Sequence, residues 1–165
     1  MRIGLLADTH DRVPAIAELV RRLQAGGANM ILHAGDYCSP FSLAPILDAN
    51  IAMAGVFGRN DGDREGLRAA AARGMGTELY ESPHSIELAG THILLVHDVG
   101  EVSERSIEGH EVIVCGCSHR KEVRSRGQSL IVNPGEGCGW LYGAATAALL
   151  DLETKQVEFV ELEGH

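Results

Sequence analysis

Side chains that bind metal ions follow five apolar, strand-like runs of this chain. Asp8 and His10 follow the first run and Asp36 follows the second, while later runs lead into the segments 58–61, 97–98 and 115–119. Ligand sites in open α/β sheets gather at the carboxyl ends of the strands, so we expect these groups to meet. Carboxylate, imidazole and amide donors delivered by separate strands predict a site for divalent metal ions.

Each of these residues also has an interpretation without a metal. Asp8 fits the turn that follows its strand, and His97 on its own is typical of a hydrogen-bonded histidine at a strand end. Asn60 suits a turn slightly better than a ligand position, and Arg59 fits solvent as well as it fits a phosphate group. Cys117 is balanced between an inert buried thiol and a metal ligand. The motifs taken together favour the metal site.

The first half of the chain alternates strands with helices, and this order predicts a parallel sheet. Residues 13–25 carry Pro14 in their first turn and apolar side chains at positions 16, 19, 20 and 23, which is helical spacing. Gly26 and Gly27 end this helix. We expect strands at 2–7, 30–33 and 51–57, and further helices at about 39–48 and 63–72.

The second half reads mainly as hairpins, and hairpins predict antiparallel strands. We expect hairpins at 85–88 with 91–96, at 121–126 with 129–132, and at 144–150 with 156–161, besides a helix at 103–107 and a strand at 111–115. An α/β fold with two mixed β-sheets packed as a sandwich and flanked by helices satisfies both halves. A single flavodoxin-like sheet is the runner-up, but it leaves several hairpins without a partner layer.

The composition is that of a globular protein, and its 165 residues predict a single domain covering 1–165. A net charge of −9 argues against binding to extended nucleic acid or to an anionic membrane surface, because both need a basic footprint. The first apolar run is too short for a signal peptide or a membrane span. The four cysteines form no C-x-x-C motif, so we expect reduced thiols and a cytoplasmic protein.

The order of the motifs resembles the calcineurin-like metallophosphoesterase family, in particular its small bacterial and archaeal phosphodiesterase branch. The resemblance covers nearly the whole chain, and as a set its pieces are specific, although each alone is weak. It implies a four-layer αββα sandwich. The matching pieces are Asp8-x-His10, Gly35-Asp36, the segment 58–61, His97, Gly116-x-x-His119, Asn133-Pro134-Gly135-Glu136 and Cys138-Gly139-Trp140-Leu141.

The resemblance also implies a pair of divalent metal ions. It assigns Asp8, His10 and His119 to the first ion. It assigns Asp36 as the bridge to a second ion, which His97 and the residues at positions 59 and 117 would hold. Two such ions can activate a water molecule and neutralise the phosphoryl oxygens. One or two ions fit this chain, with manganese, zinc, iron and nickel as candidates.

Two departures from the family pattern fall on the second ion. Arg59 stands where the family has asparagine, and a guanidinium has no acceptor for a metal. Cys117 stands where the family has histidine, and a thiolate favours soft ions such as zinc. Three outcomes follow. Arg59 replaces the second ion and grips phosphate, or the loop shifts so that Asn60 ligates, or the site is a remnant that binds a partner. Charge repulsion favours the first outcome if Arg59 points inward.

We therefore expect a metal-dependent phosphoesterase that hydrolyses phosphodiesters or phosphomonoesters by a metal-activated water. The expected catalytic residues are Asp36, Arg59, Asn60 and His97. Asn60 stands where many family members have a histidine acid, so we expect a preference for easily expelled leaving groups. The substrate class is a phosphate-ester small molecule or a nucleotide, and homo-oligomerisation stays open. The alternative is a catalytically weak or inactive scaffold that binds proteins, as a small eukaryotic retromer subunit of similar sequence does.

Overall fold

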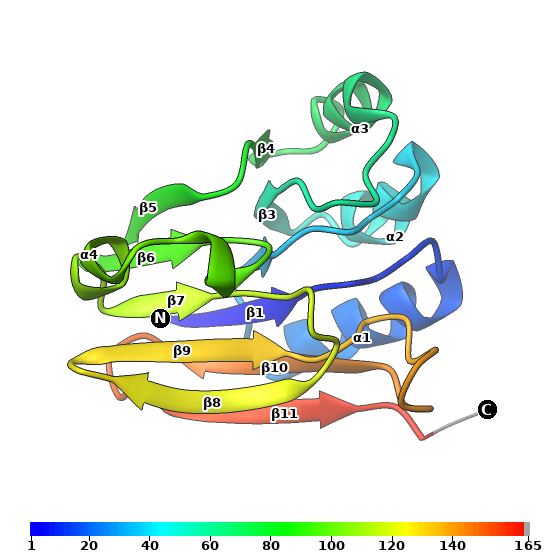
Figure 1. Ribbon diagram of the computed structural model, residues 1–165. Coiled ribbons are helices and arrows are strands. Elements are labelled where there is room, and N and C mark those ends of the chain that lie inside the picture. Colours follow the sequence, from blue (N-terminus) through cyan, green and yellow to red (C-terminus); the bar gives the residue numbers. More distant parts are fainter. Residues whose placement is uncertain (164–165) are drawn as a thin grey trace.

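The computed structural model, described here for residues 1–163, contains two β-sheets that face each other with helices on both outer sides (Figure 1). The first sheet has the strand order β11-β10-β1-β2-β3-β4, and the second has the order β5-β6-β7-β9-β8. Both sheets mix parallel and antiparallel pairs. The predicted sandwich of two mixed sheets is confirmed, and the single flavodoxin-like sheet is excluded.

The first sheet has a parallel centre and an antiparallel side. Its parallel strands are β1 (Arg2–Leu6), β2 (Met30–His33), β3 (Ala52–Val56) and β4 (Thr77–Tyr80). On the other side of β1 lie β10 (Thr146–Asp151) and β11 (Val157–Glu161), each antiparallel to its neighbour. Leu6 pairs with His33, which pairs with Gly55, so β1, β2 and β3 end at the same level.

Helices from the first half cover the outer face of this sheet. They are α1 (Val13–Ala25), the short 3-10 helix η1 (Pro40–Leu43), α2 (Ala44–Asp48) and α3 (Arg64–Ala71). The apolar stripe of α1, which includes Ile16, Leu19 and Leu23, packs in one cluster with Leu6 and Ile31 of the sheet. The predicted helix at 39–48 is present as η1 followed directly by α2.

The second sheet has parallel central strands between two antiparallel edges. Its strands are β5 (His84–Leu88), β6 (Thr91–Leu95), β7 (Val112–Val114), β8 (Lys121–Arg126) and β9 (Ser129–Pro134). The 3-10 helix η2 (Val99–Glu101) and α4 (Glu104–Glu108) lie outside it, and Ile107 of α4 packs against Ile113 and Ile131. Between the sheets, Leu5 and Val56 share a buried cluster with Leu95. These layers make the αββα order.

Among the described residues, β4 is the one strand that the sequence did not predict, and the 3-10 helix η2 was not predicted either. Only Thr77 of this strand is buried, and the following residues are exposed or half-buried, so the segment carries no continuous apolar run. It forms because its backbone pairs with β3 along the open edge of the sheet. Among the described residues, the helices are all too short or too polar to cross a membrane.

Candidate metal centre

The strand ends bring the predicted donors to one end of the sandwich. In Figure 1 the strands β1, β6 and β7 point the same way, toward the loops that carry these residues. Asp8 and His10 follow β1, Asp36 follows β2, His97 follows β6 and His119 follows β7. The loops meet through backbone bonds, since Asp8 N–H donates to the Gly35 carbonyl at 3.0 Å. Residues from both halves of the chain therefore share one pole.

Three groups of donor atoms form at this pole. Asp8, His10 and His119 make the first group, and Asp8, Asp36 and His97 make the second. His119 also forms a third group with Glu136 and Cys138, and the ligand atoms of each group lie within 4.8 Å of one another. Asp36 Oδ2 lies 3.5 Å from His10 Nε2 and 3.6 Å from His97 Nε2. His119 Nε2 lies 3.8 Å from Asp8 Oδ1. Asp36 thus stands between two imidazoles, where one carboxylate can serve two ions.

Two atoms of this cluster have no hydrogen-bond partner although they are buried. They are Asp8 Oδ2 and His10 Nε2, and within residues 1–163 the only other such side-chain atom is Thr77 Oγ1. Buried polar atoms nearly always have partners, because an unpaired one costs about 1–3 kcal/mol. The two unpaired atoms are a carboxylate oxygen and an imidazole nitrogen, which are donors for a divalent cation. The residues at the pole therefore fit a metal ion.

The electrostatics of the pole agree with this fit. Burial raises the pKa of Asp8 to about 6, against the opposing effect of His119 and His97. Burial lowers the pKa of His10, which keeps its imidazole neutral, as a ligand must be. Burial also acts to raise the pKa of Asp36, but two hydrogen bonds from Asn60 and the nearby histidines outweigh it and leave that pKa lowered.

Each histidine of the cluster is held from behind through its Nδ1 atom. His97 Nδ1 lies 2.8 Å from the Ala34 carbonyl, and His119 Nδ1 lies 2.9 Å from Glu136 Oε2. His10 Nδ1 lies 3.2 Å from the sulfur of Cys38. Such partners fix the tautomer and the ring orientation of metal-binding histidines. They leave Nε2 of every ring directed at the carboxylates.

Glu136 is the site residue whose role sequence reasoning missed. Its carboxylate is buried, and it accepts hydrogen bonds from the backbone N–H groups of Leu141 at 3.0 Å and Tyr142 at 2.6 Å. Burial acts to raise its pKa, but these bonds and His119 outweigh it and leave the pKa lowered. The sequence showed Glu136 only as one letter of a glycine-rich loop, and its contact with His119 depends on the tertiary fold.

The backbone at the pole is bent in a way that few residues adopt. Asp8, His10, Asp36, Cys117 and His119 all have positive φ angles, between 36° and 68°. Such conformations cost free energy in non-glycine residues and persist where the surrounding structure enforces them, often at functional sites. Here they turn each chain sharply after its strand, so that the donor side chains face one another.

Glycines allow the loops to approach closely at the same pole. A Cβ atom on Gly58 would lie 2.2 Å from Asp36 Oδ1, and one on Gly35 would lie 2.7 Å from the backbone nitrogen of Gly58. Asp61 ties the two loops together, because its carboxylate accepts from the backbone N–H of Gly58 at 2.6 Å and of Asp36 at 3.1 Å. Positions 35 and 58 therefore have no space for a side chain.

Arg59 points away from the metal-ligand cluster. Its Nη2 atom donates to Asp98 Oδ2 at 2.6 Å and to Glu101 Oε1 at 2.7 Å, and its side chain is 56% exposed. Asn60 takes the inner position instead. Its backbone N–H donates to Asp36 Oδ1 at 2.8 Å, and its amide Nδ2 donates to Asp36 Oδ2 at 2.7 Å. The condition for an inward, phosphate-gripping Arg59 is not met, and Asn60 faces Asp36 through its two N–H donors. Ligation of a metal by Asn60 stays a prediction.

Cys117 lies at the rim beside Arg59. Its sulfur is 3.5 Å from Arg59 Nη1 and 3.7 Å from Asp98 Oδ2. Burial raises its pKa, and Asp98 raises it further, so the thiol form is favoured. The sulfur belongs to none of the donor groups at the pole. Its ligation of a second ion stays a prediction, and the backbone N–H of Cys117 contacts Asp8 Oδ1 at 3.4 Å.

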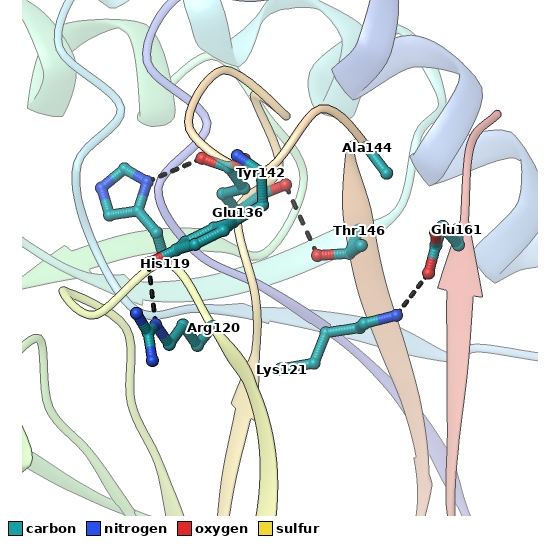
Figure 2. Close-up of a pocket in the computed structure, with 8 residues that line it drawn as sticks. All are labelled: His119, Arg120, Lys121, Glu136, Tyr142, Ala144, Thr146 and Glu161. Carbon is teal, nitrogen blue, oxygen red and sulfur yellow. Dashed lines mark hydrogen bonds and ion pairs between the residues drawn. The ribbon is translucent and has the colours of Figure 1, made fainter. Parts of the chain in front are cut away.

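A cavity of about 410 Å³ adjoins the His119 side of the pole. Figure 2 shows His119 and Glu136 at one end of this cavity, and the ion pair of Lys121 with Glu161 at the other. Arg120 lies beside Tyr142, with its Nε atom 2.8 Å from the phenol oxygen. The cavity therefore extends from His119, a candidate metal ligand, to the pair of Lys121 with Glu161.

Comparison with known proteins places the whole arrangement in context. Residues 1–155 match the model of the calcineurin-like phosphoesterase superfamily domain. A curated phosphodiesterase of Methanocaldococcus jannaschii is 28% identical over 166 residues, covering 99% of this chain and all of that protein. The solved structure of an archaeal phosphodiesterase superposes with a TM-score of 0.90 at 27% identity, covering 98% of this chain and 100% of the other. Zinc-bound Vps29 of Entamoeba histolytica has the same fold, with a TM-score of 0.68 at 17% identity over 98% and 91% of the two chains.

Proposed function

The chain belongs to the calcineurin-like phosphoesterase superfamily, a family of hydrolases, and from this membership we propose that it is a metal-dependent phosphodiesterase. The observation that carries the proposal is the pair of buried, unpartnered donor atoms on Asp8 and His10. A phosphodiester rather than a monoester substrate is supported by the name of the archaeal relative that spans the full chain.

The first ion would be held by Asp8, His10 and His119. Asp36 would be shared with a second ion, to which His97 adds an imidazole. Divalent ions bound there would supply an activated water molecule and neutralise charge on the phosphoryl oxygens. The amide of Asn60 sits on Asp36, so we assign to Asn60, rather than Arg59, the contribution of an amide at the second position.

If His97 and the other histidines of the pole hold metal ions, its inner face offers no further side chain as an acid for the leaving group. Asn60 stands in the inner position, and an amide is not an effective acid near neutral pH. Asp98, a nearby carboxyl group, has its pKa lowered by the Gly100 N–H and by Arg59, so it is ionised there. The enzyme is therefore expected to prefer esters with activated leaving groups, with nitrophenyl esters turned over faster than alkyl esters.

Hydrolysis of bis(p-nitrophenyl) phosphate with added manganese tests the proposal. Asp36→Asn removes the shared charge between His10 and His97, so we expect turnover to fall by at least about a hundred-fold. Glu87→Gln serves as the control, because Glu87 is exposed on β5 beside the 89–90 turn, and His97 follows the opposite end of β6. Unchanged turnover in Asp36→Asn, with the fold intact by circular dichroism, would place the reaction elsewhere.

The alternative of an inactive protein-binding scaffold predicts a different result in the same assay. A degenerate centre would leave the wild type inactive, and Arg59→Asn combined with Cys117→His would restore turnover by completing the family pattern. A wild type that hydrolyses the ester and loses the activity in Asp36→Asn excludes the scaffold interpretation. Elemental analysis of the purified protein then gives the identity of the ions and their number.

A further inference from the structure

We propose that Trp140 is a stacking platform for a flat aromatic ring in the alcohol part of the substrate, so that the substrates are nucleobase-bearing phosphoesters. The inference rests on the proposed function and names the substrate class of the same site. It comes from the position of one exposed side chain relative to the metal-ligand cluster. The family match does not assign this residue a role.

Trp140 lies at the mouth of the metal centre. Its ring centroid is 6.5 Å from that of His10, with 28° between the ring planes. His10 in turn lies 5.1 Å from His119, at 22°. Aromatic rings therefore lead from the first donor group to the surface, where 63% of Trp140 is exposed to solvent. When the phosphate of a ligand lies at the pole, the indole ring of Trp140 is beside the group that the phosphate carries.

The loop that carries Trp140 is fixed to the metal-binding segment. Before the tryptophan, Gly137 N–H donates to the Ala7 carbonyl at 2.8 Å and Cys138 N–H donates to the Asp8 carbonyl at 3.1 Å. After it, the N–H groups of residues 141 and 142 donate to the buried carboxylate of Glu136. Four backbone N–H groups of a short loop are thus held in place. A preorganised aromatic surface loses little entropy when a ring stacks on it.

The chemistry of the surroundings favours a small aromatic ligand over a polymer. Every nucleobase has a π-face, so a single exposed indole binds bases without reading their edges. A chain of net charge −9 lacks the basic track that a long nucleic acid needs. The neighbouring Leu141 and Tyr142 are 67% and 54% exposed, so a protein partner on this loop is the competing explanation, and the experiment separates the two.

Tryptophan fluorescence reports the proposed contact directly, because Trp140 is the only tryptophan in the sequence. We expect adenosine 5′-monophosphate to quench or shift the emission saturably. The response should occur with and without added manganese, and the affinity should differ between the two conditions. Ribose 5-phosphate carries the same phosphate and sugar without the base, and it should leave the emission unchanged. Equal responses to the two ligands, or a response to neither, would overturn the proposal.

Enzyme kinetics give a second, independent reading. Stacking of one base contributes about 1–3 kcal/mol, so Trp140→Ala should raise the KM for bis(p-nitrophenyl) phosphate about ten-fold with kcat little changed. Trp140→Phe should restore most of the loss, because it keeps a ring. Met75→Ala is the control, since Met75 is 71% exposed and lies in the turn before β4, outside the pole. An unchanged KM in Trp140→Ala would contradict the stacking role.

The outcomes separate this inference from the proposed function. The role of Trp140 alone is refuted if hydrolysis persists, the fluorescence does not distinguish adenosine 5′-monophosphate from ribose 5-phosphate, and the KM is unchanged in Trp140→Ala. A base-specific fluorescence response in a protein without hydrolysis refutes only the enzymatic function. Gel filtration decides the competing explanation: a dimer that dissociates equally in Trp140→Ala and Leu141→Ala, with no base response, would show that the loop binds a second copy instead.

Discussion

At the scale of single residues, the candidate site divides into atoms that face the metal position and atoms that hold them. The first kind could be predicted, because Asp8, His10 and Asp36 have ligand chemistry and follow apolar runs in the sequence. The second kind could not, since the contact of Glu136 with His119 joins loops whose approach only the fold determines. The sequence also could not show that Asn60, rather than Arg59, takes the inner position, because this depends on the turn geometry of segment 58–61.

Glu136 gives the residue-scale prediction. Glu136→Gln removes the charge behind His119 and replaces one of its two acceptor oxygens by an NH₂ donor, so the imidazole becomes a weaker and less ordered ligand. We expect the affinity for zinc or manganese to fall about 10- to 100-fold, as measured by calorimetry. Glu87→Gln on β5 should leave the affinity unchanged. Equal affinities in the wild type and Glu136→Gln would mean that His119 needs no such support.

At the scale of elements, most boundaries followed from local chemistry. The helix α1 begins and ends where Pro14 and Gly26 predict, and Asp63 caps α3 through the N–H of Gly66 at 2.9 Å. The hairpin of β5 and β6 turns at Ala89 and Gly90, as the sequence indicated. β4 escaped prediction because only pairing with β3 defines it, and pairing is not a local property.

The turn between β5 and β6 gives the element-scale prediction. Both of its residues have positive φ, 49° at Ala89 and 77° at Gly90, which is the pattern of a type I′ turn. Alanine is strained in that region, so Ala89→Asn should stabilise the protein by about 0.5–1 kcal/mol. Gly90→Ala should destabilise it by a similar amount, although its Cβ would meet no atom within 4 Å. Urea titration measures both, and changes of the same sign would refute the backbone argument.

At the scale of the whole molecule, His33 links folding to pH. It is fully buried at the end of β2, and burial lowers its pKa to about 3, whereas an unfolded histidine titrates near 6.5. At a pH between these two pKa values, His33 is protonated in the unfolded chain and neutral in the folded chain. The free energy of unfolding should therefore fall as the pH drops through this window, with His33 contributing up to about 1.4 kcal/mol per pH unit.

Urea unfolding between pH 4 and 7, in the presence of a chelator, checks this expectation. His33→Gln should flatten the pH dependence relative to the wild type, even if it lowers stability at every pH by disturbing the contacts to Thr9 and Gly35. His92→Gln is the control, because His92 is exposed on β6. Parallel pH profiles for the wild type and His33→Gln would remove His33 as the source of the linkage.

The position of β1 in its sheet also sets the order in which the molecule can be assembled. β1 pairs with β2 on one side, but its other side pairs with β10, so that Ile3 lies opposite Leu150. At about 5–20 residues per second, a ribosome needs roughly 7–30 seconds to supply that partner after β1 emerges. Until then, the edge of β1 that pairs with β10 stays without a partner strand, next to Asp8 and His10. In the proposed centre, an ion that needs His119 together with Asp8 and His10 could be bound only after residue 119 has been made and β7 has paired.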